Sequence, residues 1–169
     1  MVVQAPDWAY IPNINVSKAD VYRSYTPQLQ GDIPTVAMEF ISDTGSVEYS
    51  SKPTYPPGKW FFYESILKVP NYIIFEPDSC ELEVYRLDAS SAKYTIRTPD
   101  KNQRYWIEEI KLYLGTWQGT RENLICTWLR WWDEQGNLLL WGSELVEHER
   151  QRAERLAAQL RPAGIEPEN

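Results

Sequence analysis

The 169-residue sequence contains few of the residues on which thiolate-metal and histidine chemistry depend. It has one histidine, His148, and two cysteines, Cys80 and Cys126, which stand far apart. A zinc site needs several clustered Cys or His ligands, and a Ser-His-Asp triad needs a histidine beside its nucleophile. Both classes are therefore nearly excluded. Because the cysteines have no metal-ligand spacing, we predict that they are reduced thiols in a cytoplasmic protein.

Long apolar runs and positive charge are also scarce. No stretch approaches the roughly 20 apolar residues of a membrane-spanning helix. The first residues carry neither a basic region nor an apolar run, so we expect no signal peptide and no membrane association. The 17 Lys and Arg stand against 24 Asp and Glu, which gives a net charge of −7. Such a chain does not coat nucleic acid by bulk attraction, although a local, site-specific DNA contact stays compatible with this charge.

The apolar residues that are present predict an α/β domain with a central mixed sheet and flanking helices. Two near-continuous apolar runs, 34–42 and 69–76, are typical of strands buried on both faces. Residues 81–87 alternate in polarity after a Pro-Asp turn, which predicts an antiparallel hairpin with 69–76. The pair Pro56-Pro57 favours the start of a helix that runs to about Leu67. Short strands are expected near Asp7, at 94–97 and at 112–117.

The C-terminal part predicts a hairpin followed by a long helix. Residues 124–132 and 137–141 flank a turn at Gly136. Ser143 can cap a helix that reaches Arg161, before Pro162 and Gly164 stop it. Its thin apolar stripe suits packing against the body or against a dimer partner; the stripe consists of Leu145, Ala153, Leu156 and Leu160. We expect a core at 1–122 and this hairpin and helix at 123–169, within one structural unit.

The residue that most needs an explanation is Glu39, which interrupts an otherwise apolar run. A buried charge is costly unless it is paired or binds a cation. One interpretation is a structural ion pair with Lys59 or Arg23. The other interpretation is a metal ligand.

Several segments together resemble the Uma-type restriction endonuclease family of the PD-(D/E)xK nuclease superfamily. The residues Pro6-Asp7 begin a strand, Glu39 lies in the run Met-Glu-Phe-Ile-Ser, and Lys59 precedes Tyr63 by four residues. Residues 72–77 and 82–87 are similar to the family patterns "YwivDp" and "levyrl". The C-terminal part, with the run Trp-Leu-Arg-Trp-Trp at 128–132, also looks like the tail of this family.

The resemblance implies a restriction-endonuclease-like fold and an active site for phosphodiester hydrolysis. Asp7 and Glu39, with the backbone carbonyl of Phe40, would hold Mg²⁺ or Mn²⁺, which are hard ions that prefer oxygen ligands. The ammonium of Lys59 would orient a water or neutralise the scissile phosphate. The second-choice lysine is Lys52, and Tyr63 would support the site one helical turn after Lys59.

The implied function is that of a Mg²⁺-dependent DNA endonuclease acting as a homodimer. Family members usually carry a segment before the Pro-Asp strand, whereas Asp7 stands near the beginning of this sequence. This difference leaves a second hypothesis, a catalytically degenerate dimeric module that binds nucleic acid or protein. The aromatic residues at 128–132, which alternate with Arg130, could then stack on unpaired bases. A third hypothesis is a sheet protein that binds a small ligand through an aromatic pocket.

Overall fold

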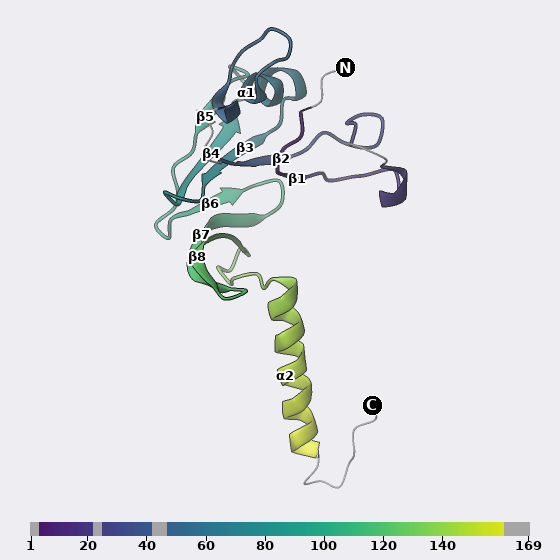
Figure 1. The fold of residues 1–169 in the computed structure, drawn as a ribbon, viewed down its shortest axis with the longest axis vertical. Coiled ribbons are helices and arrows are strands. Elements are labelled where there is room, and N and C mark those ends of the chain that lie inside the picture. Colours follow the sequence, from purple (N-terminus) through teal and green to yellow (C-terminus); the bar gives the residue numbers. More distant parts are fainter. Residues whose placement is uncertain (1–3, 22–24, 42–46, 161–169) are drawn as a thin grey trace.

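The computed structural model describes residues 4–21, 25–41 and 47–160, and it has a mixed α/β architecture (Figure 1). A five-stranded mixed sheet has the strand order β1-β2-β3-β4-β5, and a three-stranded antiparallel sheet has the order β6-β7-β8. The strands are β1 (Trp8–Tyr10), β2 (Val36–Phe40), β3 (Asn71–Glu76), β4 (Glu81–Leu87), β5 (Tyr94–Ile96), β6 (Arg104–Ile107), β7 (Leu112–Arg121) and β8 (Leu124–Trp132). The helical elements are η1 (Lys18–Asp20), η2 (Val47–Tyr49), α1 (Lys59–Phe61), the π-helical segment η3 (Phe62–Leu67) and α2 (Gly142–Leu160).

The strand β2 lies in the interior of the larger sheet, antiparallel to β1 and parallel to β3. Because parallel strands cannot be joined by a tight turn, the chain crosses over between β2 and β3 and forms α1 and η3 on the way. Successive side chains of a strand point to opposite faces of the sheet. Met38 therefore faces one side of the sheet, while Ala37 and Glu39 face the other.

Different parts of the chain pack on the two faces of this sheet. On one face, Ala37, Tyr72 and Ile74 pack against Tyr63 and Val69 of the crossover. On the other face, the residues of β2, β3 and β4 pack against the three-stranded sheet; this second cluster contains Val36, Met38, Ile73, Val84, Ile107 and Leu114. The larger sheet is thus the middle layer, and the predicted restriction-endonuclease-like architecture is confirmed as a mixed α/β fold.

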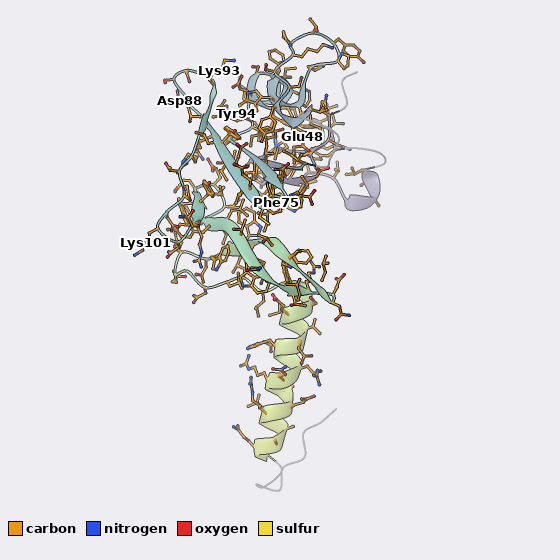
Figure 2. All side chains as sticks on the ribbon, turned by 60° about the vertical axis from the view of Figure 1, so that its left-hand side comes forward. Glu48, Phe75, Asp88, Lys93, Tyr94 and Lys101 are labelled. Atoms are coloured by element: carbon orange, nitrogen blue, oxygen red, sulfur yellow. The ribbon has the colours of Figure 1, made fainter. Side chains whose placement is uncertain are left out.

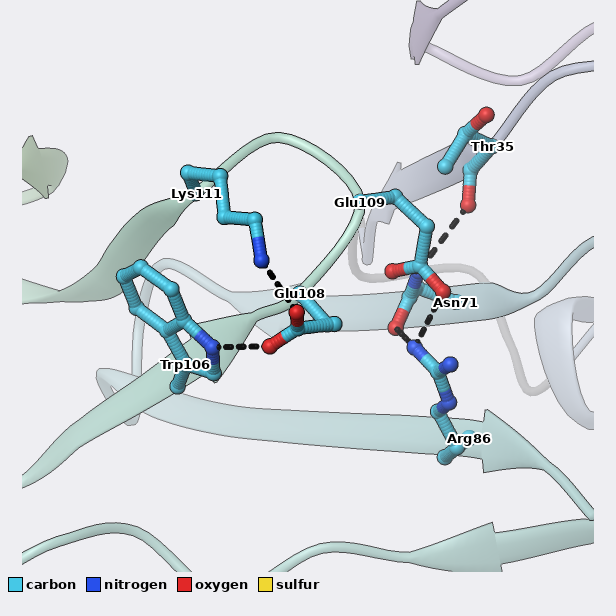
Figure 3. Close-up of polar contacts among 7 residues, drawn as sticks. All are labelled: Thr35, Asn71, Arg86, Trp106, Glu108, Glu109 and Lys111. Atoms are coloured by element: carbon cyan, nitrogen blue, oxygen red, sulfur yellow. Dashed lines mark hydrogen bonds and ion pairs between the residues drawn. The ribbon is translucent and has the colours of Figure 1, made fainter.

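A polar network joins the two sheets at the beginning of β3 (Figure 3). The buried amide of Asn71 donates to the Thr35 carbonyl at 3.1 Å and to Glu109 Oε2 at 2.9 Å. Arg86 of β4 donates to Asn71 Oδ1 at 3.2 Å and pairs with Glu109 Oε1 at 2.5 Å. Since Glu109 belongs to the β6–β7 connection, Asn71 and Arg86 fix that connection to the larger sheet. On the same connection, Glu108 accepts from Trp106 and Lys111.

Several predicted elements agree with the structure, and others differ. The strands at 34–42, 69–76 and 94–97 are confirmed with shorter bounds, and the strand at 81–87 and the hairpin turn at 77–80 are confirmed as predicted. The helix begins at Lys59, three residues after Pro56, because Gly58 still has an extended backbone. The strand β6 was not predicted, and β7 is longer than expected.

The predicted pairing of 124–132 with 137–141 is wrong. The strand β8 pairs along its length with β7, and only Leu138 forms a bridge to Trp132. The two turn residues, Glu122 and Asn123, have φ values of 50° and 66°, which suit the tight turn of a two-residue hairpin. The predicted division at 122/123 therefore coincides with this turn, and both predicted parts contribute strands to the three-stranded sheet.

The helix α2 extends away from both sheets, with no other described element beside it (Figure 1). It begins one residue before the predicted cap Ser143, and its predicted end at 161–164 lies outside the described residues. The predicted packing of this helix against the body is wrong, since nearly all its described side chains are exposed. Cys80 and Cys126 are free thiols, as predicted. In the described part of the chain, no helix combines the length and apolarity needed to cross a membrane.

Candidate functional site

The candidate site lies on the helix-covered face of the larger sheet, around Glu39. Trp8 of β1 is paired with Met38 of β2, so continuing this register by one residue places Asp7 opposite Glu39. Directly opposed residues of antiparallel strands share a face of the sheet. Asp7 Oδ2 accepts a hydrogen bond from the Phe40 backbone N–H at 2.8 Å, which holds the aspartate beside the end of β2. Glu39 is completely buried, with 0% of its surface exposed.

Lys59 is the cation that pairs with Glu39. Its Nζ lies 3.0 Å from Glu39 Oε2 and 3.6 Å from Glu48 Oε1, and 19% of its side chain is exposed. Lys59 is the first residue of α1, and its position is fixed because the preceding residue, Gly58, packs closely against residues 50–52. The Gly58 N–H donates to the Lys52 carbonyl at 2.9 Å. A Cβ atom on Gly58 would lie 2.0 Å from the Ser50 carbonyl oxygen, so only glycine permits this approach.

Glu48 is a residue of the site that the sequence did not reveal. It lies on the short helix η2, which the sequence pattern indicated only as a loop. The hydroxyl of Tyr72 in β3 donates to the Glu48 carbonyl at 2.9 Å. The next residue, Tyr49, stacks on Trp60 with ring centroids 6.4 Å apart. These contacts fix the Glu48 backbone above the sheet, where its carboxylate lies 3.6 Å from the Lys59 ammonium.

Tyr63 is placed under the site by η3. Its side chain is fully buried and packs on Tyr72, with ring centroids 5.2 Å apart. Burial and the nearby charge of Glu39 raise the pKa of the Tyr63 phenol well above its ordinary value, so Tyr63 stays protonated. Segments of π-helix are rare and occur frequently at functional sites. The structure thus packs Tyr63 against the sheet and places it near Glu39; a supporting role in a site stays a prediction.

The charges of the site influence one another. Burial raises the pKa of Glu39; the hydrogen bond and charge of Lys59 act in the opposite direction, and the negative charge of Asp7 adds to the increase. Burial lowers the pKa of Lys59, but the hydrogen bond and charge of Glu39 and the charge of Glu48 bring it above its ordinary value. Lys59 is therefore a cation, and its ammonium opposes the effect of burial on the pKa of Glu39, as does the Tyr63 hydroxyl.

Two carboxylate oxygens of this site are buried without a partner. Glu39 Oε1 and Glu48 Oε2 are buried without a hydrogen-bond partner, and so is the Tyr63 hydroxyl. This hydroxyl lies near enough to Glu39 to lower the pKa of its carboxyl group. Buried acceptors of this kind cost free energy unless something else satisfies them. Oxygen donors on Asp7 and Glu39 suit a hard divalent cation, which commonly keeps several waters beside one or two carboxylates. Within the ranges that the structure describes, no three acidic, His or Cys side chains converge as a complete cage for a metal ion.

Two other predicted candidates lie outside this cluster. Lys52 is exposed on the loop that follows η2, and Lys59 takes the place beside Glu39. Arg130 is buried beneath Trp141, with its guanidinium carbon 3.6 Å from the ring centroid, and pairs with Glu144 at 2.7 Å. Trp128 donates to the Gly119 carbonyl at 3.0 Å. The aromatic segment therefore secures the beginning of α2, and Arg130 is not exposed for stacking on bases. Arg23, the other predicted partner of Glu39, lies outside the described residues.

Comparison with known protein families gives one match, over residues 3–117, to a family described as "Uma2: Putative restriction endonuclease". This match covers more than half of the chain and includes every residue of the candidate site. A search of curated proteins and a search of solved structures each gave no significant match.

Proposed function

The chain belongs to the Uma2 restriction endonuclease family, and we propose that it is a metal-dependent DNA endonuclease whose active site is formed by Asp7, Glu39 and Lys59. Asp7 and Glu39 would hold Mg²⁺ or Mn²⁺, with the Phe40 carbonyl as a further ligand. When bound, the cation would supply Lewis-acid stabilisation of the negative charge that develops on a phosphodiester.

The side chains of the protein would perform three tasks around this cation. The Lys59 ammonium, fixed at the first position of α1, provides positive charge where the phosphate would lie. Glu48, with Oε1 3.6 Å from this ammonium, would help to hold it in place. The buried, protonated Tyr63 lies beside Glu39 and would restrict the movement of its carboxylate.

The observation that carries this proposal is the state of Glu39. One carboxylate oxygen pairs with Lys59, and the other lies on the face shared with Asp7. Neither this second oxygen nor the Tyr63 hydroxyl, which lies near Glu39, has a hydrogen-bond partner. An ion pair selected only for stability would have its remaining lone pairs satisfied, because a half-satisfied buried charge is a cost. The pair Glu64–Lys93 illustrates this contrast. Glu64 is also buried, and besides its pairing with Lys93 it accepts hydrogen bonds from the Trp60 indole and the Tyr94 N–H.

The test is cleavage of supercoiled and linear DNA by the full chain with Mg²⁺ or Mn²⁺. The variants Glu39→Gln and Asp7→Asn should each reduce cleavage by at least about a hundredfold, as expected for loss of a residue that stabilises the transition state. The matched control is Glu64→Gln, which changes another buried glutamate with a lysine partner and should retain activity. A folded wild-type protein that cuts no DNA with either metal would favour the degenerate binding module instead.

A further inference from the structure

The helix α2 has no packing partner along most of its length. Figures 1 and 2 show it projecting from the sheets, surrounded only by its own side chains. Its attachment to the body is at its first turn, where Glu144 accepts from Arg130 at 2.7 Å and from the Trp141 N–H at 2.7 Å. Isolated helices of this length are only marginally stable in water, and most helices gain their stability from packing an apolar face.

The two sides of α2 differ in the side chains that they expose to water. On one side, Arg150 pairs with Glu147 at 2.8 Å and with Glu154 at 2.5 Å, and Gln151 donates to Glu147 at 2.6 Å. This side is therefore satisfied within the helix and suits contact with water. The opposite side carries Leu145 and Leu156, which are 50% and 52% exposed.

Between these two leucines lie Glu149 and Arg152, which form a long ion pair with each other at 3.7 Å. The four residues follow one another at spacings of four, three and four. That spacing is the one by which a helix presents a seam to a second helix. The two pairs of positions, 145 with 156 and 149 with 152, are centred on the same point of the helix, between residues 150 and 151. An antiparallel second copy, crossing at the midpoint of this seam, would place Leu145 against the partner's Leu156. It would also place Glu149 against the partner's Arg152.

We propose that α2 is a dimerisation helix, and that it binds α2 of a second copy of this chain in an antiparallel orientation. A parallel arrangement would oppose Glu149 to its own copy and Arg152 to its own copy, which is unfavourable on both counts. The antiparallel arrangement converts both contacts into ion pairs and closes with twofold symmetry. A polar pair inside an apolar seam fixes the register of paired helices in this way.

The geometry leaves room for this pairing. A helix of 19 residues is about 28 Å long, so an antiparallel pair holds the two sheet domains at its opposite ends. The seam lies outside the residues that match the endonuclease family, and the inference does not depend on the proposed cleavage activity. The interface is short and half polar, so we expect a weak dimer, in which monomer and dimer are both populated over the protein concentrations used in solution.

The experiment is sedimentation equilibrium of the full chain and of charge-reversed variants over a range of protein concentrations. The single variants Glu149→Arg and Arg152→Glu each oppose like charges across the seam, and each should weaken self-association by at least about tenfold. Mixed together, the two single variants should form a heterodimer, because every contact across the seam is again between opposite charges. The double variant E149R/R152E should form a homodimer like the wild type.

The matched control is Glu154→Arg, which makes the same change of charge on the opposite side of α2 and should leave self-association unchanged. Far-ultraviolet circular dichroism of each variant checks that the helix persists. A wild-type protein that is monomeric at every concentration would overturn the proposal. Single variants that dimerise as tightly as the wild type would also overturn it, as would a double variant that fails to recover.

Discussion

Replacement of Lys59 by methionine tests how the site holds a buried charge. The substitution preserves the length of the apolar stem and removes the ammonium that lies 3.0 Å from Glu39 Oε2. Glu39 has no exposed surface, so no water replaces the lost partner. Breaking a buried ion pair from one side costs about 3–5 kcal/mol. Because 19% of the Lys59 side chain is exposed, the lower part of this range, about 3 kcal/mol, is the expected loss in unfolding free energy.

The opposite substitution should cost much less. In Glu39→Gln the buried charge disappears, while Lys59 keeps Glu48 at 3.6 Å and its contact with water. The expected change in unfolding free energy is within about 1 kcal/mol of zero, in either direction. The double variant K59M/E39Q should recover most of the stability that Lys59→Met loses, since no unpaired charge remains. A coupling between the two substitutions of roughly 2 kcal/mol would express this recovery.

The loss in Lys59→Met should also depend on pH. The pKa of Glu39 is already raised by burial, and removal of Lys59 raises it further. The folded state then favours the protonated acid. The free energy of unfolding of Lys59→Met is therefore highest below the ordinary glutamate pKa of 4.5, and it declines as pH rises through the pKa of Glu39 in the folded state. The deficit of Lys59→Met relative to wild type should accordingly shrink as the solution becomes acidic.

Urea unfolding, followed by tryptophan fluorescence from near pH 4.5 to neutral pH, measures these differences. Glu64→Gln serves as the reference for the removal of another buried glutamate, which lies on η3. The reasoning is refuted if Lys59→Met loses less than about 1 kcal/mol at neutral pH, or if its deficit is independent of pH.

Two further substitutions test the positioning of the site and the connection between the sheets. Gly58→Ala would place a Cβ atom 2.0 Å from the Ser50 carbonyl oxygen. This substitution should destabilise the fold by about 1–3 kcal/mol, and it should also reduce DNA cleavage because it displaces Lys59. Gly142→Ala, whose Cβ atom would meet open space, should have neither effect. Asn71→Ala removes an amide that bonds Thr35 and Glu109 and should cost about 2 kcal/mol of unfolding free energy. Thermal unfolding measures both, and an unchanged melting temperature in either variant would contradict the corresponding contact.

The sequence was most informative where burial imposed a pattern on it. The runs that became β2 and β3 are apolar on both faces because each lies between a helix layer and a second sheet. Glu39 could be singled out for the same reason, since a charge within such a run requires a partner. The ion pair with Lys59 was one of the predicted outcomes, and the structure contains it.

The sequence was least informative where long-range packing decided the structure. Glu48 reaches the site only because η2 folds over the sheet, and nothing in its local sequence distinguishes it from a loop acid. The β7–β8 turn lacks the glycine that usually marks a tight hairpin, so the glycine at 136 indicated the wrong pairing. Base stacking by the segment around Arg130 was one possibility and packing against the core was the other; the structure shows packing, because Trp141 and Glu144 close over Arg130.

The most direct measurement of the central claim is calorimetric titration of Mn²⁺ into the wild-type chain and into Asp7→Asn, Glu39→Gln and Glu64→Gln. The account predicts that the wild type and Glu64→Gln bind one ion with similar affinity, and that each of the other two variants loses at least about tenfold in affinity. Equal binding by all four proteins, or binding by none of them, would contradict the assignment of Asp7 and Glu39 as the ligands of a catalytic cation.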